Sequence, residues 1–553
     1  MLRFTAALVC STALLGLVVV ASGCSAASDD ASGGAGPGSG PGSSGTGAGS
    51  TGTFSGAGGG GGEGAGGLTG DPKTCAEAAE YKTYLGCDFW PTVTANNVWS
   101  LFDYAVVVAN AGDTPAEVTV SRGANQISTE TIPPNELRTI YLPWVTQLKG
   151  PDADACGGAT PLSQTVKLAD GAYHLVSSVP VTVYQFSPLQ YAPQGGPPGK
   201  NWNNCPALGC FLECFSYSND ASLLLPSTAM TGNYRVAGFP GWAQANIGSF
   251  LAITGVEDGT TVDVYLGANG AVVGGGGVSG AAGNGQVSFT LQRGEVVELV
   301  GTTTSDFSGS LVQSSKPVQV LTGLPCVNVP NGNPYCDHVE ESVFPAETLG
   351  QRYFVTVPTG PRGNPVGHVV RIVGNVDGTA LSYPSGAPGG APATIGAGQV
   401  VDLGIVNQDF EIVGDKEFIV ATFQLGSSLV DPSGGQDAMG DPAQSISTAV
   451  EQYRTKYVFL APSDYELSIA DIVMPTGAQV TIDGAPIGVT PTPIGSGFGV
   501  ARVTLGPGNN GAHLLQSTLP VGLQVIGYGD DTSYQYPGGL NLSLIAPPPP
   551  IPQ

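Results

Sequence analysis

Charge and helical periodicity are both scarce in this sequence of 553 residues. Charged residues make up 11% of the chain. Almost no stretch repeats apolar residues at the 3.6-residue spacing of an amphipathic helix. Acidic residues outnumber basic ones by 43 to 18, which gives a net charge of −25. Such a surface repels nucleic acid and anionic lipid, so we expect neither as a partner.

Motifs of common enzyme classes are also missing. The sequence has no G-x-S-x-G elbow, no H-E-x-x-H and no Walker loop. These absences argue against a common enzyme. The tether, the disulfides, the acidic surface and the family resemblance described below favour a non-catalytic binding or adhesion protein. Two alternatives remain open. One is a secreted carbohydrate-active hydrolase, because a pair of catalytic carboxylates can come from distant strands. The other is a structural component of the cell envelope.

Long apolar runs are absent except at the N-terminus. Met1-Leu2-Arg3 supplies a basic n-region through Arg3, and residues 4–20 are apolar over the length of a secretory signal core. Ala21-Ser22-Gly23-Cys24 then resembles a bacterial lipobox. We predict a signal peptide at 1–23 and lipidation of Cys24; an ordinary signal peptide cut elsewhere is the alternative. The expected location is the bacterial cell envelope, at the outer membrane or cell surface, with membrane contact through the lipid anchor alone.

Glycine and proline are abundant instead, with 84 and 44 residues. Residues 25–70 are rich in Gly, Ser and Ala and hold almost no large apolar side chain, so they cannot bury enough surface to fold. We predict a flexible tether over 24–72 and a Pro-rich tail over 546–553.

Between tether and tail, one pattern of short β-strands occurs four times. Each copy has an opening strand (102–109, 249–255, 368–374, 467–474) followed by a turn, a third element (135–142, 294–300, 398–403, 500–505) and a last strand (180–186, 317–322, 417–423, 520–526). Proline begins three of the last strands, where its missing N–H breaks no ladder bond. We predict an all-β protein of tandem antiparallel β-sandwich-like modules over 73–216, 217–339, 340–446 and 447–545, with a β-propeller as the alternative.

Cysteine usage indicates an exported protein. If Cys24 carries lipid, eight cysteines remain, and an even number outside the cell predicts disulfides: Cys75, Cys87, Cys156, Cys205, Cys210, Cys214, Cys326 and Cys336. Local spacing favours Cys326–Cys336 and, less strongly, Cys75–Cys87. A zinc site at Cys205, Cys210 and Cys214 is the alternative for those three.

The segment that follows Cys336 is the candidate ligand or metal loop. It carries Asp337, His338, Glu340 and Glu341, beside a Cys-bracketed stretch that occurs in only one of the four copies. Carboxylate and imidazole groups are metal ligands, so Ca²⁺ is the candidate cofactor. The alternative is that Asp337 bonds backbone N–H groups of a turn while the other side chains face water.

Several stretches carry a family resemblance. They are Asp306-Phe307-Ser308-Gly309-Ser310, the 312–318 strand, Gly323 to Cys326, Cys336 to Glu341 and the 347–354 segment. They resemble the N-terminal domain of IgGFc-binding proteins, most clearly over residues 220–430, and 81–90 is similar to the opening of myxobacterial members. The resemblance implies an extracellular β-rich binding or adhesion module whose partner is a protein or a glycan.

Overall fold

The computed structural model describes residues 51–53, 71–207, 210, 213–506 and 511–551. The predicted signal peptide, Cys24 and nearly all of the tether lie outside these residues. The all-β prediction is confirmed, since the described chain pairs its strands antiparallel throughout and holds only short helices. The helices are α1 (Cys75–Tyr81), α2 (Thr146–Lys149), α3 (Ser427–Val430) and six single 3-10 turns.

The chain builds four modules on one eight-strand plan, each made of two four-stranded sheets. In the sheet that we call the inner sheet, the third element, the opening strand and the last strand lie side by side, and a fourth strand follows. The inner sheets are β6 (Glu136–Tyr141), β3 (Ala105–Asn110), β8 (His174–Phe186), β9 (Ala221–Leu223); β15 (Val296–Gly301), β11 (Phe250–Gly255), β17 (Val318–Val327), β18 (Asp337–Ser342); β23 (Val400–Val406), β20 (His368–Gly374), β25 (Phe418–Gln424), β26 (Gln444–Ile446); and β32 (Phe498–Leu505), β28 (Leu467–Pro475), β33 (Ala512–Gly529), β34 (Thr532–Pro537).

The second sheet of each module, the outer sheet, also repeats its order. The outer sheets are β2 (Gly86–Phe89), the first half of β8, β4 (Ala116–Arg122), β5 (Asn125–Ile132); β10 (Asn233–Arg235), β16 (Leu311–Ser314), β12 (Thr260–Tyr265), β14 (Gln286–Leu291); β19 (Arg352–Val355), β24 (Phe410–Gly414), β21 (Thr379–Ser382), β22 (Thr394–Ile395); and β27 (Arg454–Leu460), the first half of β33, β29 (Val480–Ile482), β30 (Ala485–Pro486). Four further strands extend the edges: β1 (Thr51–Thr53), β7 (Val166–Leu168), β13 (Val272–Val273) and β31 (Thr492–Gly495).

Apolar side chains from both sheets of a module share one core. In the second module, Val262 and Val264 of β12 alternate with outward-facing residues and pack in the same cluster as Val318 and Val320 of β17. This alternation is what a strand with one buried face requires. Each module is therefore sandwich-like, as the sequence pattern predicts.

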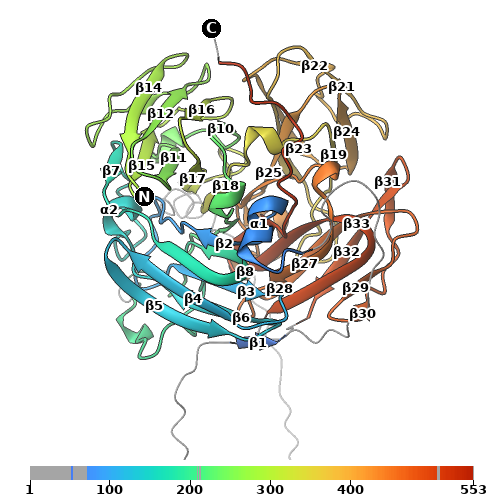
Figure 1. The fold of residues 1–553 in the computed structure, drawn as a ribbon, viewed down its shortest axis with the longest axis horizontal. Helices are drawn as coiled ribbons and strands as arrows, with labels where there is room; N and C mark the ends of the chain where they lie inside the picture. The colour runs from blue at the N-terminus through green and yellow to red at the C-terminus, as the bar shows by residue number, and fades with distance from the viewer. Residues whose placement is uncertain (1–50, 54–70, 208–209, 211–212, 507–510, 552–553) are drawn as a thin grey trace, which may run out of the picture.

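The modules close into a ring, with the innermost strands β9, β18, β26 and β34 meeting along its axis (Figure 1). We call these four the axis strands. The ring is a propeller-like arrangement of the four inner sheets, which corresponds to the alternative left open by the sequence. The sequence pattern indicates seven strands per copy, whereas the structure has eight, because each last strand turns back into an axis strand across a loop. Because β9 pairs with β8, the first module extends past residue 216, and β18 spans the predicted boundary at 339.

The two ends of the described chain meet and close the ring. The N–H of Tyr84 donates to the carbonyl oxygen of Leu540 at 3.2 Å, and the N–H of Leu542 donates to the carbonyl oxygen of Lys82 at 2.8 Å. Arg454 of the fourth module pairs with Asp71 at 2.5 Å. The first module is thus fastened directly to the fourth.

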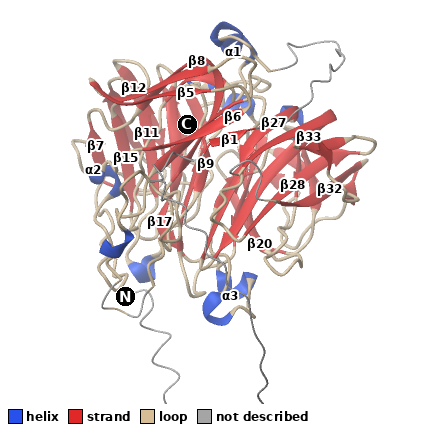
Figure 2. Ribbon diagram, turned by 90° about the horizontal axis from the view of Figure 1, so that it is seen from below, coloured by secondary structure: helices blue, strands red, loops and turns tan. Residues whose placement is uncertain are grey.

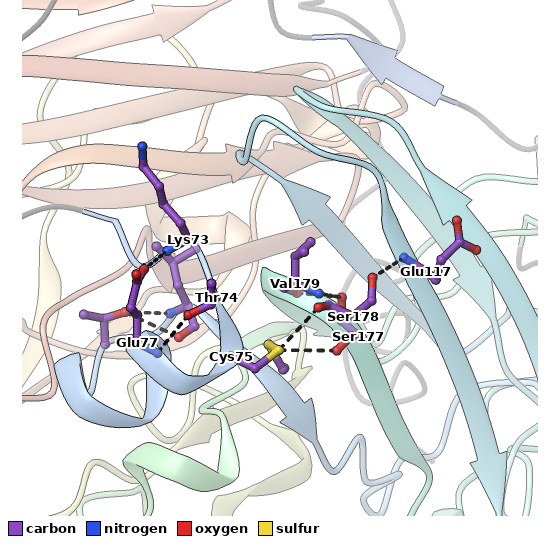
Figure 3. Close-up of a disulfide and its surroundings, with 11 residues drawn as sticks. Lys73, Thr74, Cys75, Glu77, Glu117, Ser177, Ser178 and Val179 are labelled. Carbon is purple, nitrogen blue, oxygen red and sulfur yellow. Dashed lines mark hydrogen bonds between the residues drawn. A yellow bond between two sulfur atoms is a disulfide. The ribbon is translucent and has the colours of Figure 1, made fainter.

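Helix α1 supports this closure (Figure 3). Its N-cap Thr74 accepts a hydrogen bond from the N–H of Glu77 at 3.2 Å, which satisfies one of the free amides of the first turn. Cys75 is bonded to Cys87 of β2, and its Sγ lies 3.6 Å from the carbonyl oxygen of Ser178. The disulfide therefore fastens α1 to β2, with Ser178 of β8 alongside.

Candidate functional site

The four loops that lead into the axis strands emerge at one end of the ring. Their described residues are 187–207, 210, 213–220, 328–336, 425–443 and 530–531. The loops lie together because the four hairpins run in the same direction about the axis. We call this the loop end. Helix α3, in the third loop, lies on the opposite side of the molecule from α1 (Figure 2). Loops on a rigid scaffold are where binding residues concentrate.

Disulfides staple the loop end. The predicted pairs Cys326–Cys336 and Cys75–Cys87 are confirmed. The remaining four cysteines pair as Cys156–Cys210 and Cys205–Cys214. The zinc alternative is therefore wrong, because its three sulfurs are all consumed in disulfides. Three of the four bridges restrain the loop end, and Cys75–Cys87 restrains the opposite one.

A pocket of about 100 Å³ opens between the first three modules at the loop end. Two disulfides line it, one through Cys156 and one through the Cys326–Cys336 pair. Trp99 forms part of the wall and anchors the neighbouring loop, because its Nε1–H donates to the carbonyl oxygens of Ala153 and Asp154 at 3.1 Å. The pocket's volume suits a single side chain or one ring of a partner rather than a whole drug-sized ligand.

Two tyrosines on this pocket have a strained backbone. Tyr217 has φ 51° and Tyr335 has φ 72°, and both line the cavity. The left-handed region costs a bulky residue on the order of 1–3 kcal/mol, and such strain clusters at functional sites. The sequence analysis did not single out either residue. Their position before a Cys or in a Ser-rich loop carries no local signal of this conformation.

Asp337, His338, Glu340 and Glu341 follow Cys336, which lines the pocket, and they form a strand rather than the predicted loop. They belong to strand β18, and all four are fully buried. Burial is possible because each carboxylate finds donors across the axis; Glu340, for example, accepts from Gln185 Nε2 at 2.6 Å. Their role as ligands stays a prediction.

The hydrogen bonds of these four residues go mainly to other groups in the protein interior. Asp337 accepts from the N–H groups of Asn219 and His338, as the turn-bonding alternative expects, although the other three side chains do not face water. Burial raises the pKa of Asp337 and of Glu341 well above the usual range. Within the described residues, no group of three or more His, Cys, Asp or Glu is arranged to hold a metal ion.

Asp220 joins all four modules on the axis. Its carboxylate accepts backbone N–H groups from Ala221 at 2.9 Å, Glu340 at 3.0 Å, Gln444 at 3.0 Å and Gln535 at 3.3 Å. These four residues occupy equivalent positions on β9, β18, β26 and β34. Burial raises the pKa of Asp220 well above its ordinary value, and the four N–H bonds act in the opposite direction.

The fold and the site together define a propeller-like all-β protein with disulfide-stapled loops around an open pocket. The family model described as IgGFc binding protein matches residues 220–527, more than half of the chain, and the chain belongs to this family. The match begins at Asp220 and runs into β33. The resemblance inferred from the sequence motifs is thereby confirmed.

Human IgGFc-binding protein is a relative, 26% identical over 333 residues, which are 59% of this chain and 6% of the human protein. The chain thus matches a small part of that relative's length. Among solved structures, a GH78 family rhamnosidase of Bacillus sp. GL1 aligns at 11% identity over 82% of this chain and 55% of that chain. Its TM-score of 0.11 is too low to indicate a shared fold.

Among the described residues, no helix has the length and apolar character needed to cross a membrane.

Proposed function

We propose that the chain is a non-catalytic binding protein that takes an extracellular protein or glycan in the pocket at the loop end. The observation that carries this proposal is the pair of tyrosines, Tyr217 and Tyr335, whose strained backbone places them on an open pocket between disulfide-stapled loops. Membership of a family named for binding supports the same class of function.

The pocket chemistry favours a ligand with both apolar and hydroxyl or amide groups. Tyrosine presents a ring for stacking and a hydroxyl for hydrogen bonding, which suits both sugars and protein side chains. Ser216, Ser218 and Asp441 add polar groups at the same cavity. An immunoglobulin G Fc fragment is one probe among several, because that name belongs to the human relative.

The test is a glycan and protein array, including the Fc fragment, probed with the wild-type chain and with Tyr217→Gly and Tyr335→Gly. Glycine accepts positive φ without strain, so these variants should fold while losing the ring. We expect binding to weaken by about tenfold or more, the usual range for an aromatic anchor. Tyr265→Ala is the matched control, since Tyr265 ends β12 and lies outside this pocket. Array hits that persist in both glycine variants would refute the assignment of the pocket.

We also propose that lipid on Cys24 anchors the protein in the bacterial cell envelope, on the basis of the leader and lipobox-like residues. Metabolic labelling with a radioactive fatty acid should mark the wild-type chain and not Cys24→Ser. Labelling of both, or of neither, would contradict the anchor without affecting the pocket.

A further inference from the structure

A small polar cavity of about 40 Å³ lies between the third and fourth modules, away from the pocket at the loop end. Three buried oxygens that line it have no hydrogen-bond partner among the described residues: Asp471 Oδ1, Thr448 Oγ1 and Gln535 Oε1. Their residues are 1%, 9% and 3% exposed. Buried polar atoms almost always have a hydrogen-bond partner. Three unpartnered oxygens on one cavity therefore indicate a place where a ligand binds.

Neighbouring bonds hold these oxygens in place. Asp471 Oδ2 accepts from the hydroxyl of Thr356 at 3.2 Å, which leaves Oδ1 for the cavity. Gln535 Nε2 donates to Thr422 Oγ1 at 3.2 Å, so the amide is oriented and its Oε1 is left over. Thr356 and Thr422 also line the cavity. The lining therefore offers carboxylate, amide and hydroxyl oxygens, which are the ligands of hard cations.

The carboxyl of Asp471 lines this cavity, and its negative charge suits a cation. Asp471 is buried, and the guanidinium of Arg502, whose charge acts on it, is engaged elsewhere: Arg502 Nη2 lies 2.5 Å from Asp409 Oδ1 and donates to the carbonyl oxygen of Val357 at 3.0 Å. A buried carboxylate requires a compensating charge or a proton.

The equivalent interface between the second and third modules shows what fills this position there. Arg371 and Asp471 occupy equivalent positions in their modules. Arg371 lies opposite Ala421 on β25 and Asp471 lies opposite Gln524 on β33, and each of these partners is two residues before the residue opposite the Asp220 donor on the axis strand. The Arg371 guanidinium pairs with Asp306 at 2.5 Å and bonds Ser308 Oγ at 2.9 Å. One interface thus has a side-chain cation, and the next has a carboxylate beside a cavity.

We propose that this cavity binds one Ca²⁺ ion, held by Asp471, Gln535 and Thr448 with water completing the shell, and that the ion joins the third and fourth modules. A site with a single carboxylate should bind weakly, with a Kd of about 10⁻⁴–10⁻³ M, the range of extracellular calcium modules. The proposal is independent of the function proposed for the loop-end pocket.

The experiment is calorimetric titration of the chelator-treated full chain with CaCl₂, with MgCl₂, NaCl and KCl as separate arms, together with Tm measured in each salt. We expect one Ca²⁺ per chain and a rise in Tm at millimolar CaCl₂. Asp471→Asn should weaken binding at least tenfold. Asp483→Asn is the matched control, because Asp483 is also a bonded aspartate of the fourth module but bonds His513 and Leu514 outside the cavity.

Thr448→Val is the second variant, and it still tests the proposal if Asp471→Asn folds poorly. It removes an oxygen that has no hydrogen-bond partner among the described residues, so the ion-free Tm should hold while Ca²⁺ affinity falls several-fold. The proposal is overturned if the wild type binds no Ca²⁺, if an alkali ion binds in its place, or if both variants bind like the wild type.

Discussion

Single buried side chains connect parts of this molecule that are far apart in sequence. The donors to Asp220 come from residues 120, 224 and 315 positions away, in addition to its own neighbour. A tyrosine near the start of each of the last three modules likewise connects distant parts of the chain. Tyr353, for example, accepts from the N–H of Gly350 at 3.2 Å and donates to the carbonyl oxygen of Phe418 at 2.6 Å. Tyr234 and Tyr457 make the corresponding two bonds.

Asp220→Asn should destabilise the fold by about 2–4 kcal/mol. The amide turns one acceptor oxygen into a donor, which then faces backbone N–H groups that have lost their partner. Urea unfolding at neutral pH measures the change. Asp113→Asn, at an exposed turn, should leave the midpoint within error. An unchanged midpoint for the Asp220 variant would mean that the four bonds contribute no net stability.

At the scale of elements, two disulfides that close loops of similar length should contribute equally to stability but differently to binding. Cys326–Cys336 spans 10 residues and lies on the pocket, whereas Cys75–Cys87 spans 12 residues and holds α1 at the other end. Chain entropy predicts a similar stabilisation for each, about 2–3 kcal/mol. Their effects on ligand capture should nevertheless differ.

Replacing Cys326 and Cys336 together by serine should lower the free energy of unfolding by about 2–3 kcal/mol and also weaken binding at the pocket. Replacing Cys75 and Cys87 together should cost a similar amount of stability while binding is retained. Denaturant titration and array binding of the two double variants make the comparison. Equal loss of binding in both would show that the bridge acts only through global stability.

At the scale of the whole molecule, buried carboxyl groups make stability depend on pH. Burial, reinforced by Glu466, raises the pKa of Asp464 to about 7, and burial with neighbouring carboxylates raises that of Asp530 to about 6. A carboxyl whose folded pKa is raised holds its proton more tightly in the folded state, so its contribution falls as pH rises from about 4 to 7. In the opposite direction, the pairing with Arg371 outweighs burial and lowers the pKa of Asp306, whose contribution is lost below about pH 4.

We therefore expect greatest stability near pH 4, with a Tm at pH 8 lower by about 2–5 °C than at pH 5. Asp464→Asn should remove part of this slope, raising Tm more at pH 8 than at pH 5. Scanning calorimetry at the two pH values tests both statements. A Tm that rises from pH 5 to pH 8 would contradict them.

Much of the scaffold could be predicted because its signals are local. Alternating apolar residues located the opening and last strands of all four modules, and spacing identified Cys326–Cys336 and Cys75–Cys87 as pairs. Asp337 and its neighbours were singled out from the sequence as a candidate site, but their surroundings were not predictable. Their hydrogen-bond partners come from other modules, and nothing in the sequence nearby encodes that contact.

The sequence by itself determined the all-β class, the fourfold pattern of strands, the acidic surface and the family motifs. Each of these depends on neighbouring residues or on composition, which a single chain displays directly. Only the tertiary structure decided that the modules close into a ring, that Asp220 lies at its centre, and that Asp471 meets Gln535 and Thr448 at one cavity. These features arise where strands from different modules pack together, and the angle at which they meet is set by side chains separated by hundreds of residues.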